Sequence, residues 1–263
     1  MKSLLSQIFR RNPLLAWFGS GFFLLSAILL LLIPFNETTV LGINSLVKPL
    51  KFAISIGIYA WTMAYLLHYF QSKRLVRNFN ILIVVTMLFE QAVITVQAFR
   101  GTLSHFNQDS PLENILFGLM GLFISALTLY TLFAAFRFRK QSGPLNLTQA
   151  QKEGIFYGML IFVAAGFIGG FMGSLNSHNI GGAMGEAGLP FVNWSTTIGD
   201  LRVSHFIGLH ALQILPLVAF GLRRSLSSKQ QSLLWTRVIS LGYALIVLIT
   251  FLQALWGMPL WQM

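Results

Sequence analysis

Long apolar stretches separated by short polar segments make up most of the chain. An α-helix needs about 20 apolar residues to cross about 30 Å of hydrocarbon. Seven stretches meet this requirement, and we place the predicted spans at 14–34, 50–70, 79–99, 114–136, 155–175, 201–222 and 233–257. The pattern predicts an all-α, polytopic membrane protein with seven transmembrane helices in a single transmembrane domain, residues 1–263.

Basic residues are concentrated in alternate connections between the predicted spans. Fourteen of the 18 lie before the first span, in the second-to-third and fourth-to-fifth connections, or at the junction of the sixth and seventh spans. The positive-inside rule makes these segments cytoplasmic. We therefore predict a cytoplasmic N-terminus and a C-terminus on the outer side.

Composition supports a lipid environment. The chain is 55% hydrophobic and 10% charged, whereas about a quarter of the residues in a soluble domain are charged. The formal net charge of +11 does not indicate nucleic acid, because the basic residues form short clusters between apolar runs. The chain has no cysteine, which excludes thiolate chemistry, Fe–S clusters and Cys-type zinc sites.

Two pairs of segments indicate an internal repeat. Residues 50–60 align without gaps with 201–211, and residues 96–101 align with 252–257. The two offsets are 151 and 156, so the full alignment requires an insertion. We predict a 3+1+3 arrangement, in which the fourth span joins two parallel three-helix repeats. The alternative is chance likeness between apolar helices.

Some basic and ionisable residues are not accounted for by the positive-inside rule, and they lie toward the predicted outer side. The basic ones are at the mouths of spans: Lys48, Lys51, Arg100 and Arg202. Glu90 lies about 15 Å inward of Arg100 and His210 about 12 Å inward of Arg202, at about 1.5 Å per residue. An ionisable group at this depth is costly against lipid, so we expect a partner or a hydrated cavity. Glu90 is the only acidic residue that we place inside a span.

Helical spacing groups these residues on two faces. Glu90, Gln97 and Arg100 form one stripe on the third span, since they are seven and three residues apart. Four polar groups share a sector of the sixth span, about 140° wide. We predict an outward polar pocket between the second, third and sixth spans, lined by Glu90, Gln97, Arg100, Arg202, His205, His210, Gln213 and Lys51.

Other residues have structural interpretations. Asp200 immediately precedes the sixth span and is placed to cap it. Small residues four apart let a neighbouring helix approach closely, and the fifth span has two such pairs, Gly166 with Gly170 and Gly169 with Gly173. The glycine-rich connection 176–199 suits a lid over the pocket or an ordinary flexible loop.

A metal site is the alternative use of these side chains. His205 and His210 are five residues apart, whereas chelation from one helix favours a spacing of four. A site built across helices would draw on His105, His205, His210, Glu90 and Asp200, a donor set that suits Zn²⁺ or iron. Haem held by two histidines also remains open.

Two strings, Glu90 to Asn107 and Asn193 to His210, resemble an uncharacterised bacterial family of multi-span integral membrane proteins. The likeness extends from Lys48 to Pro216. The resemblance implies location in a bacterial inner membrane and implies no activity.

Together these observations favour a transporter or channel for a small, anionic solute or ion, with proton involvement. A membrane-embedded metal-dependent enzyme is the second hypothesis, and an accessory subunit of a membrane complex is the third. The expected partners are the lipid bilayer and a small-molecule or ion ligand, with no nucleic acid. The oligomeric state, including a homo-oligomer, is left open.

Overall fold

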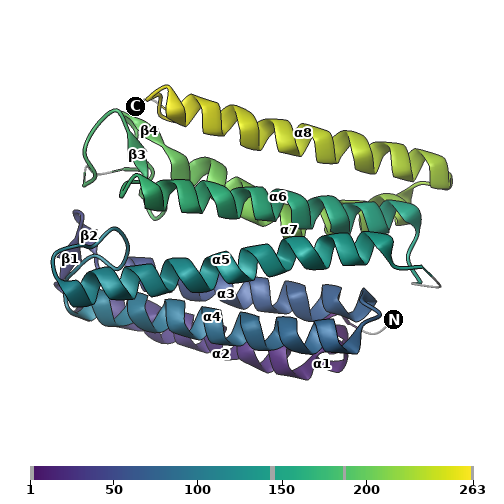
Figure 1. The fold of residues 1–263 in the computed structure, drawn as a ribbon, viewed down its shortest axis with the longest axis horizontal. Helices are drawn as coiled ribbons and strands as arrows, with labels where there is room; N and C mark the ends of the chain where they lie inside the picture. The colour runs from purple at the N-terminus through teal and green to yellow at the C-terminus, as the bar shows by residue number, and fades with distance from the viewer. Residues whose placement is uncertain (1–2, 143–145, 186–187, 262–263) are drawn as a thin grey trace. The chain divides into compact units, whose positions relative to one another are not determined.

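The computed structural model describes residues 3–142, 146–185 and 188–261, and its regular structure is helical apart from two short two-stranded sheets (Figure 1). Within these residues, seven helices are long and apolar enough to cross a membrane, which supports a multi-pass membrane protein. The helices are α1 Leu4–Arg11, α2 Pro13–Leu32, α3 Val47–Leu66, α4 Lys73–Phe99, α5 Pro111–Lys140, α6 Gln149–Ser174, α7 Leu201–Ser225 and α8 Lys229–Leu255. Two 3-10 turns, η1 Ile33–Phe35 and η2 Leu67–Tyr69, extend α2 and α3.

Several helices begin earlier than the predicted spans because polar first turns continue the helix beyond the apolar part. α4 starts at Lys73 rather than 79, and α6 starts at Gln149 rather than 155. Side chains at the N-caps fix these starts: Ser72 accepts a hydrogen bond from the backbone of Leu75, and Thr148 forms a capping box with Gln151. Hydropathy therefore locates the membrane-spanning part of a helix, and capping locates its end.

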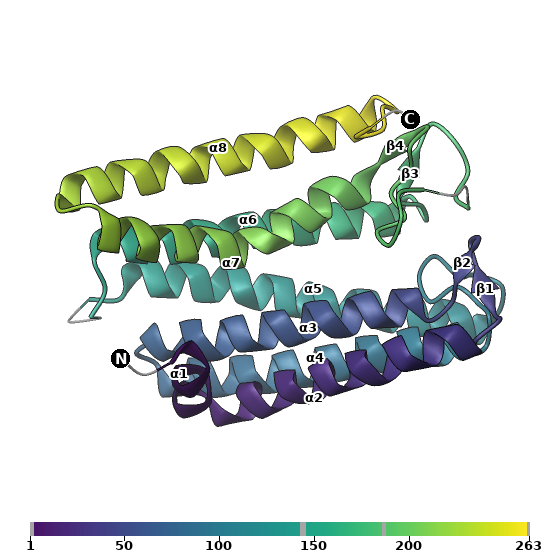
Figure 2. The same ribbon diagram turned by 180° about the vertical axis from the view of Figure 1, so that it is seen from behind.

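The chain divides into two compact units, residues 1–127 and 128–263, with the boundary inside α5. In the first unit, α2 packs along α3, and α4 contacts both (Figure 2). Its fully buried side chains include Leu15, Met63, Phe79 and Ile83.

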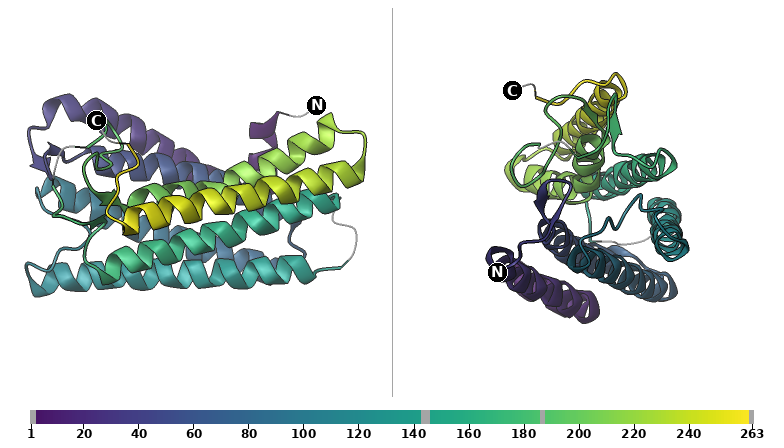
Figure 3. Two further views of the ribbon diagram at one scale, coloured as in Figure 1. Left: turned by 90° about the horizontal axis from the view of Figure 1, so that it is seen from above. Right: turned by 90° about the vertical axis from the view of Figure 1, so that its left-hand side faces the viewer.

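In the second unit, α6, α7 and α8 lie side by side (Figure 3). Glycine makes the α6–α7 contact close. A Cβ added at Gly154 would lie 2.9 Å from the carbonyl oxygen of Leu215, and one at Gly158 would lie 2.9 Å from that of Ala211. The predicted packing role of Gly166 and Gly169 is confirmed, because added Cβ atoms there would meet Thr128 and His205. Gly170 instead faces open space.

From α2 and from α6 onward the two units have the same order of elements: a helix, an antiparallel pair of short strands and two further helices. In the first unit β1 (Thr39–Val40) pairs with β2 (Ile43–Asn44) before α3, and in the second β3 (Asn179–Ile180) pairs with β4 (Gly199–Asp200) before α7. Both pairings are antiparallel. This order agrees with the predicted 3+1+3 arrangement.

The two aligned segment pairs also agree in local structure. α4 and α8 end in the same Schellman-type hydrogen bonds, in which Thr102 N donates to Gln97 O and Met258 N donates to Gln253 O. Gly101 and Gly257 both have positive φ there, 68° and 74°. Along α3 and α7 the equivalent positions are buried: Leu50, Ala53, Gly57, Ala60 and Ala64 against Leu201, Ser204, Gly208, Ala211 and Leu215.

Large apolar side chains remain exposed along the long helices. Leu31, Leu122, Leu217 and Leu241 are each more than 60% exposed. Apolar surface of this extent on several helices indicates contact with lipid rather than with water.

Candidate functional site

Several of the predicted site residues occur in two polar clusters, one in each unit. The first, here called the Glu90 cluster, lies where α3 begins, α4 ends and α5 begins, and it comprises Lys48, Gln97, Arg100, His105 and Glu113, with Glu90 deeper in α4 and within reach of the Lys48 charge. The second, here called the Asp200 cluster, joins the α6–α7 connection to α7 and comprises His178, Asn193, Ser195, Asp200 and Arg202.

The predicted stripe on α4 is confirmed between two of its members. The Arg100 guanidinium donates to Gln97 Oε1 at 2.8 Å. Both side chains also bind Glu113 from the first turn of α5: Arg100 Nη1 lies 2.7 Å from Glu113 Oε1, and the Gln97 amide donates to Glu113 Oε2. These contacts fix the start of α5 against the end of α4.

Lys48 and His105 meet at the same end of the first unit. Lys48 Nζ lies 3.3 Å from His105 Nδ1, and Ser104 Oγ lies 3.1 Å from that nitrogen. The imidazole ring packs against Phe52, at 5.8 Å between ring centres. Lys51 follows Lys48 by one turn on α3 and is partly buried.

The Glu90 carboxyl group has fewer polar contacts than the other charged groups of this cluster. Its side chain is 5% exposed, and Lys48 is the basic residue whose charge acts on it. Within the described part of the chain, no hydrogen bond or salt bridge joins Glu90 to another side chain. One turn earlier, Thr86 Oγ1 is fully buried and has no hydrogen-bond partner among the described residues. Thr86 is therefore a buried unsatisfied polar group one turn from a buried carboxyl group inside α4, which is costly unless the site has a use.

The expectation that Glu90 is the only acidic residue inside a span is wrong. Glu113 in α5 is 5% exposed and Glu153 in α6 is 2% exposed. Glu153 accepts two hydrogen bonds of 2.7 Å from Arg237 of α8 and one of 3.0 Å from Gln149. Glu113 lies in the first turn of α5, and Glu153 lies one turn into α6. Both come just before the predicted apolar spans, so hydropathy alone places them in the connections.

Asp200 caps α7, as predicted: its Oδ1 accepts a hydrogen bond of 3.0 Å from the backbone of Arg202. The same carboxylate binds the Arg202 guanidinium at 2.6 Å and accepts from the Ser195 backbone at 2.9 Å. His178 Nδ1 lies 3.9 Å away. Arg202 also donates to the carbonyl of Asn193. This cluster fastens the predicted lid segment to the start of α7.

The three remaining predicted residues lie along α7. His205 Nδ1 donates to the carbonyl oxygen of Ala165 on α6 at 2.7 Å, which links the two helices. The His210 ring packs edge-on against Phe206, at 4.4 Å between ring centres. Gln213 follows His210 by one turn and is partly buried.

The predicted pocket residues are divided between the two units. Lys51, Glu90, Gln97 and Arg100 belong to the first, and Arg202, His205, His210 and Gln213 to the second. The pocket between α3, α4 and α7 therefore stays a prediction. Across the described ranges, no group of three or more His, Asp or Glu side chains could hold a metal ion. Of the predicted ligands, Glu90 and His105 lie in the first unit, and Asp200, His205 and His210 in the second.

No family model, curated protein or solved structure matches this chain. A helical bundle does not define an activity, because one fold supports many functions. Function is therefore inferred from the side chains of the two clusters.

Proposed function

We propose that the protein transports or conducts a small, anionic solute or ion across a bacterial inner membrane, with proton exchange at Glu90. The observation that carries the proposal is the Glu90 carboxyl group, buried in a membrane-spanning helix without a hydrogen-bonding partner among the described residues. Intramembrane carboxyl groups of this kind mark ion and proton pathways. In the proposed orientation, with the N-terminus cytoplasmic and the C-terminus outside, the Glu90 cluster opens to the outer side.

Charge around Glu90 supports an anionic solute. Three basic residues lie near the start of α3 and the end of α4, at the same end of the first unit: Lys48, Lys51 and Arg100. Basic groups at the mouth of a low-dielectric channel raise the local concentration of anions. Arg100 is half-exposed although it binds Glu113, so part of its guanidinium faces out of the cluster.

The charge on Glu90 would couple the uptake of a proton to the uptake of an anion. A neutral Glu90 no longer offsets the positive charge of Lys48, so an anion is attracted more strongly. An ionised Glu90 offsets that cation and weakens the attraction, since opposite charges in a low dielectric interact strongly. Uptake of a proton and of an anion would thus favour each other.

Proton-coupled flux in proteoliposomes tests the proposal. Purified protein is reconstituted with a trapped pH-sensitive dye, and chloride, nitrate, formate, acetate and phosphate are added separately across an imposed pH gradient. We expect at least one anion to cause protein-dependent internal acidification. Glu90→Gln should abolish it, and the matched control Glu37→Gln, at an exposed position outside the spans, should keep it.

Proton movement that is unchanged in Glu90→Gln would refute the role of this carboxyl group. If the glutamine variant does not fold, Glu90→Asp keeps an ionisable group at the same position. Coupled flux in the folded aspartate variant would support the proposal, and a folded but inactive aspartate variant alongside an active Glu37→Gln variant would argue against proton exchange at an ionisable group in this position.

A further inference from the structure

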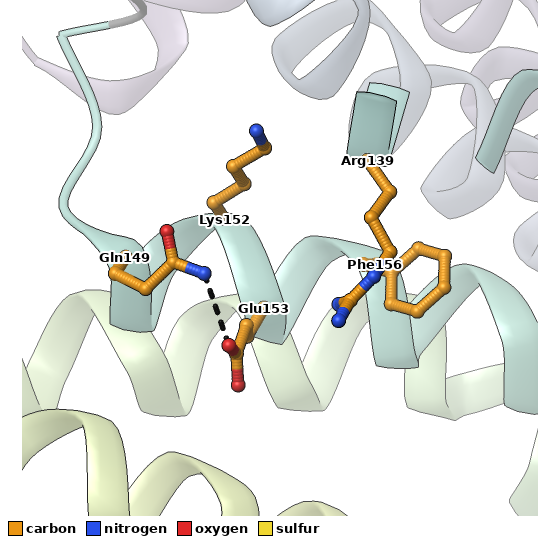
Figure 4. Close-up of a pocket in the computed structure, with 5 residues that line it drawn as sticks. All are labelled: Arg139, Gln149, Lys152, Glu153 and Phe156. Atoms are coloured by element: carbon orange, nitrogen blue, oxygen red, sulfur yellow. Dashed lines mark hydrogen bonds between the residues drawn. The ribbon is translucent and has the colours of Figure 1, made fainter. Parts of the chain in front are cut away.

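A cavity of about 160 Å³ lies between the last turn of α5 and the first turns of α6, within the second unit (Figure 4). It is lined by Arg139, Gln149, Lys152, Glu153 and Phe156. None of these residues belongs to the Glu90 or the Asp200 cluster.

The cavity carries an excess of positive charge. Glu153 is already compensated, because Arg237 and Gln149 bind both of its oxygens. Lys152 donates one hydrogen bond of 3.1 Å to the carbonyl of Gln141, and an ammonium group has two further donors. The lining therefore suits an anion.

Arg139 is placed to bind that anion. Its guanidinium lies over the Phe156 ring, 4.6 Å from the ring centre. No hydrogen bond joins it to another residue in the part of the chain that the structure describes. The stacked guanidinium is held in place while its donors remain available, and such a planar group binds phosphate through two parallel hydrogen bonds.

The length of α5 puts the cavity at headgroup depth. A helix of 30 residues is about 45 Å long, whereas the hydrocarbon core is about 30 Å thick. The surplus of about 15 Å means that the terminal turns of α5 extend into the headgroup region. The last turn contains Arg137, Arg139 and Lys140, which are all basic.

Apolar surface continues from the cavity along α5 toward the hydrocarbon. Phe136, one turn before Arg139, is 48% exposed, and its ring lies 5.9 Å from that of Phe156. Phe133, a further turn before, is 52% exposed. A ligand with a phosphate at Arg139 and acyl chains along these rings fits this surface better than free phosphate does.

We propose that this cavity binds the phosphate of an anionic phospholipid headgroup. Arg139 and Lys152 hold the phosphate, Gln149 lies at the rim, and the acyl chains follow Phe136 and Phe133. Basic pockets at the ends of transmembrane helices bind anionic headgroups by the same chemistry.

Native mass spectrometry of the full chain in detergent tests the proposal. Phosphatidylglycerol and phosphatidylcholine are titrated separately into the wild type, into the variant Arg139→Gln/Lys152→Gln, and into the matched control Arg137→Gln/Lys140→Gln. The control removes the same charge from exposed positions at the same helix end that do not line the cavity. We expect the cavity variant to weaken phosphatidylglycerol binding roughly thirtyfold and the control by less than threefold.

Equal losses in both variants would overturn the proposal in favour of diffuse surface charge. Equal binding of both lipids by the wild type would also overturn it, and that comparison needs no variant to fold. Displacement of phosphatidylglycerol by millimolar inorganic phosphate would overturn the lipid assignment and indicate a soluble phosphate as the ligand.

Discussion

The close contact between α6 and α7 predicts opposite effects for the same substitution at two glycines of α6. A Cβ at Gly154 would lie 2.6 Å from the Ala219 Cβ and 2.9 Å from the Leu215 carbonyl oxygen. Contacts of Cβ atoms below 3.0 Å essentially never occur, and a backbone carbonyl cannot rotate away as a side chain can. Gly170, on the same helix, has no atom within 4 Å of an added Cβ.

Both variants gain the same favourable contribution to the free energy of unfolding, and one of them also has an unfavourable contribution. Replacing glycine by alanine inside a helix stabilises by about 0.5–1 kcal/mol. Overpacking a tight contact costs about 1–3 kcal/mol, which applies to Gly154→Ala alone. Gly170→Ala should therefore be neutral or slightly stabilising, and Gly154→Ala should be less stable than it by about 1–3 kcal/mol.

Thermal unfolding in detergent, followed by tryptophan fluorescence, measures this difference. One kcal/mol corresponds to about 2–4 °C in Tm for a chain of this size class. We expect the Tm of Gly154→Ala to lie below that of Gly170→Ala by a few degrees or more. Equal Tm values would show that the helices can separate without cost, and the inference of glycine-dependent packing would fail.

Two further predictions follow from the second unit. Asp200→Ala removes both the cap of α7 and the partner of Arg202, so we expect a larger loss of thermal stability than in Asp200→Asn, which keeps a capping side chain; equal losses would mean that capping contributes nothing there. On metal content, we expect elemental analysis of the purified protein to find no stoichiometric transition metal. A metal that is lost in His205→Ala or His210→Ala would instead favour the metal-dependent enzyme.

The sequence predicted contacts between neighbouring residues better than contacts between residues far apart in the chain. The cap at Asp200 and the contact between Gln97 and Arg100 were found because both depend on residues a few positions apart. The burial of Glu113 and Glu153 was missed because their partners are distant in sequence: Glu113 binds Gln97, 16 residues away, and Glu153 binds Arg237, 84 residues away. A signal for Glu113 was present, since an acidic residue in a first turn is favoured by the helix dipole.

The sequence by itself determined the seven spans and the all-helical class, because a bilayer requires about 20 apolar residues per crossing and a helix satisfies its own backbone hydrogen bonds. Only the tertiary structure decided which buried acidic residues of the long helices have a charged partner. Glu113 and Glu153 have arginine partners, whereas Glu90 has no hydrogen bond or salt bridge to any residue in the described ranges. Burial of a charge depends on packing between helices, and the hydrophobic periodicity of a single helix does not predict which helices pack against it.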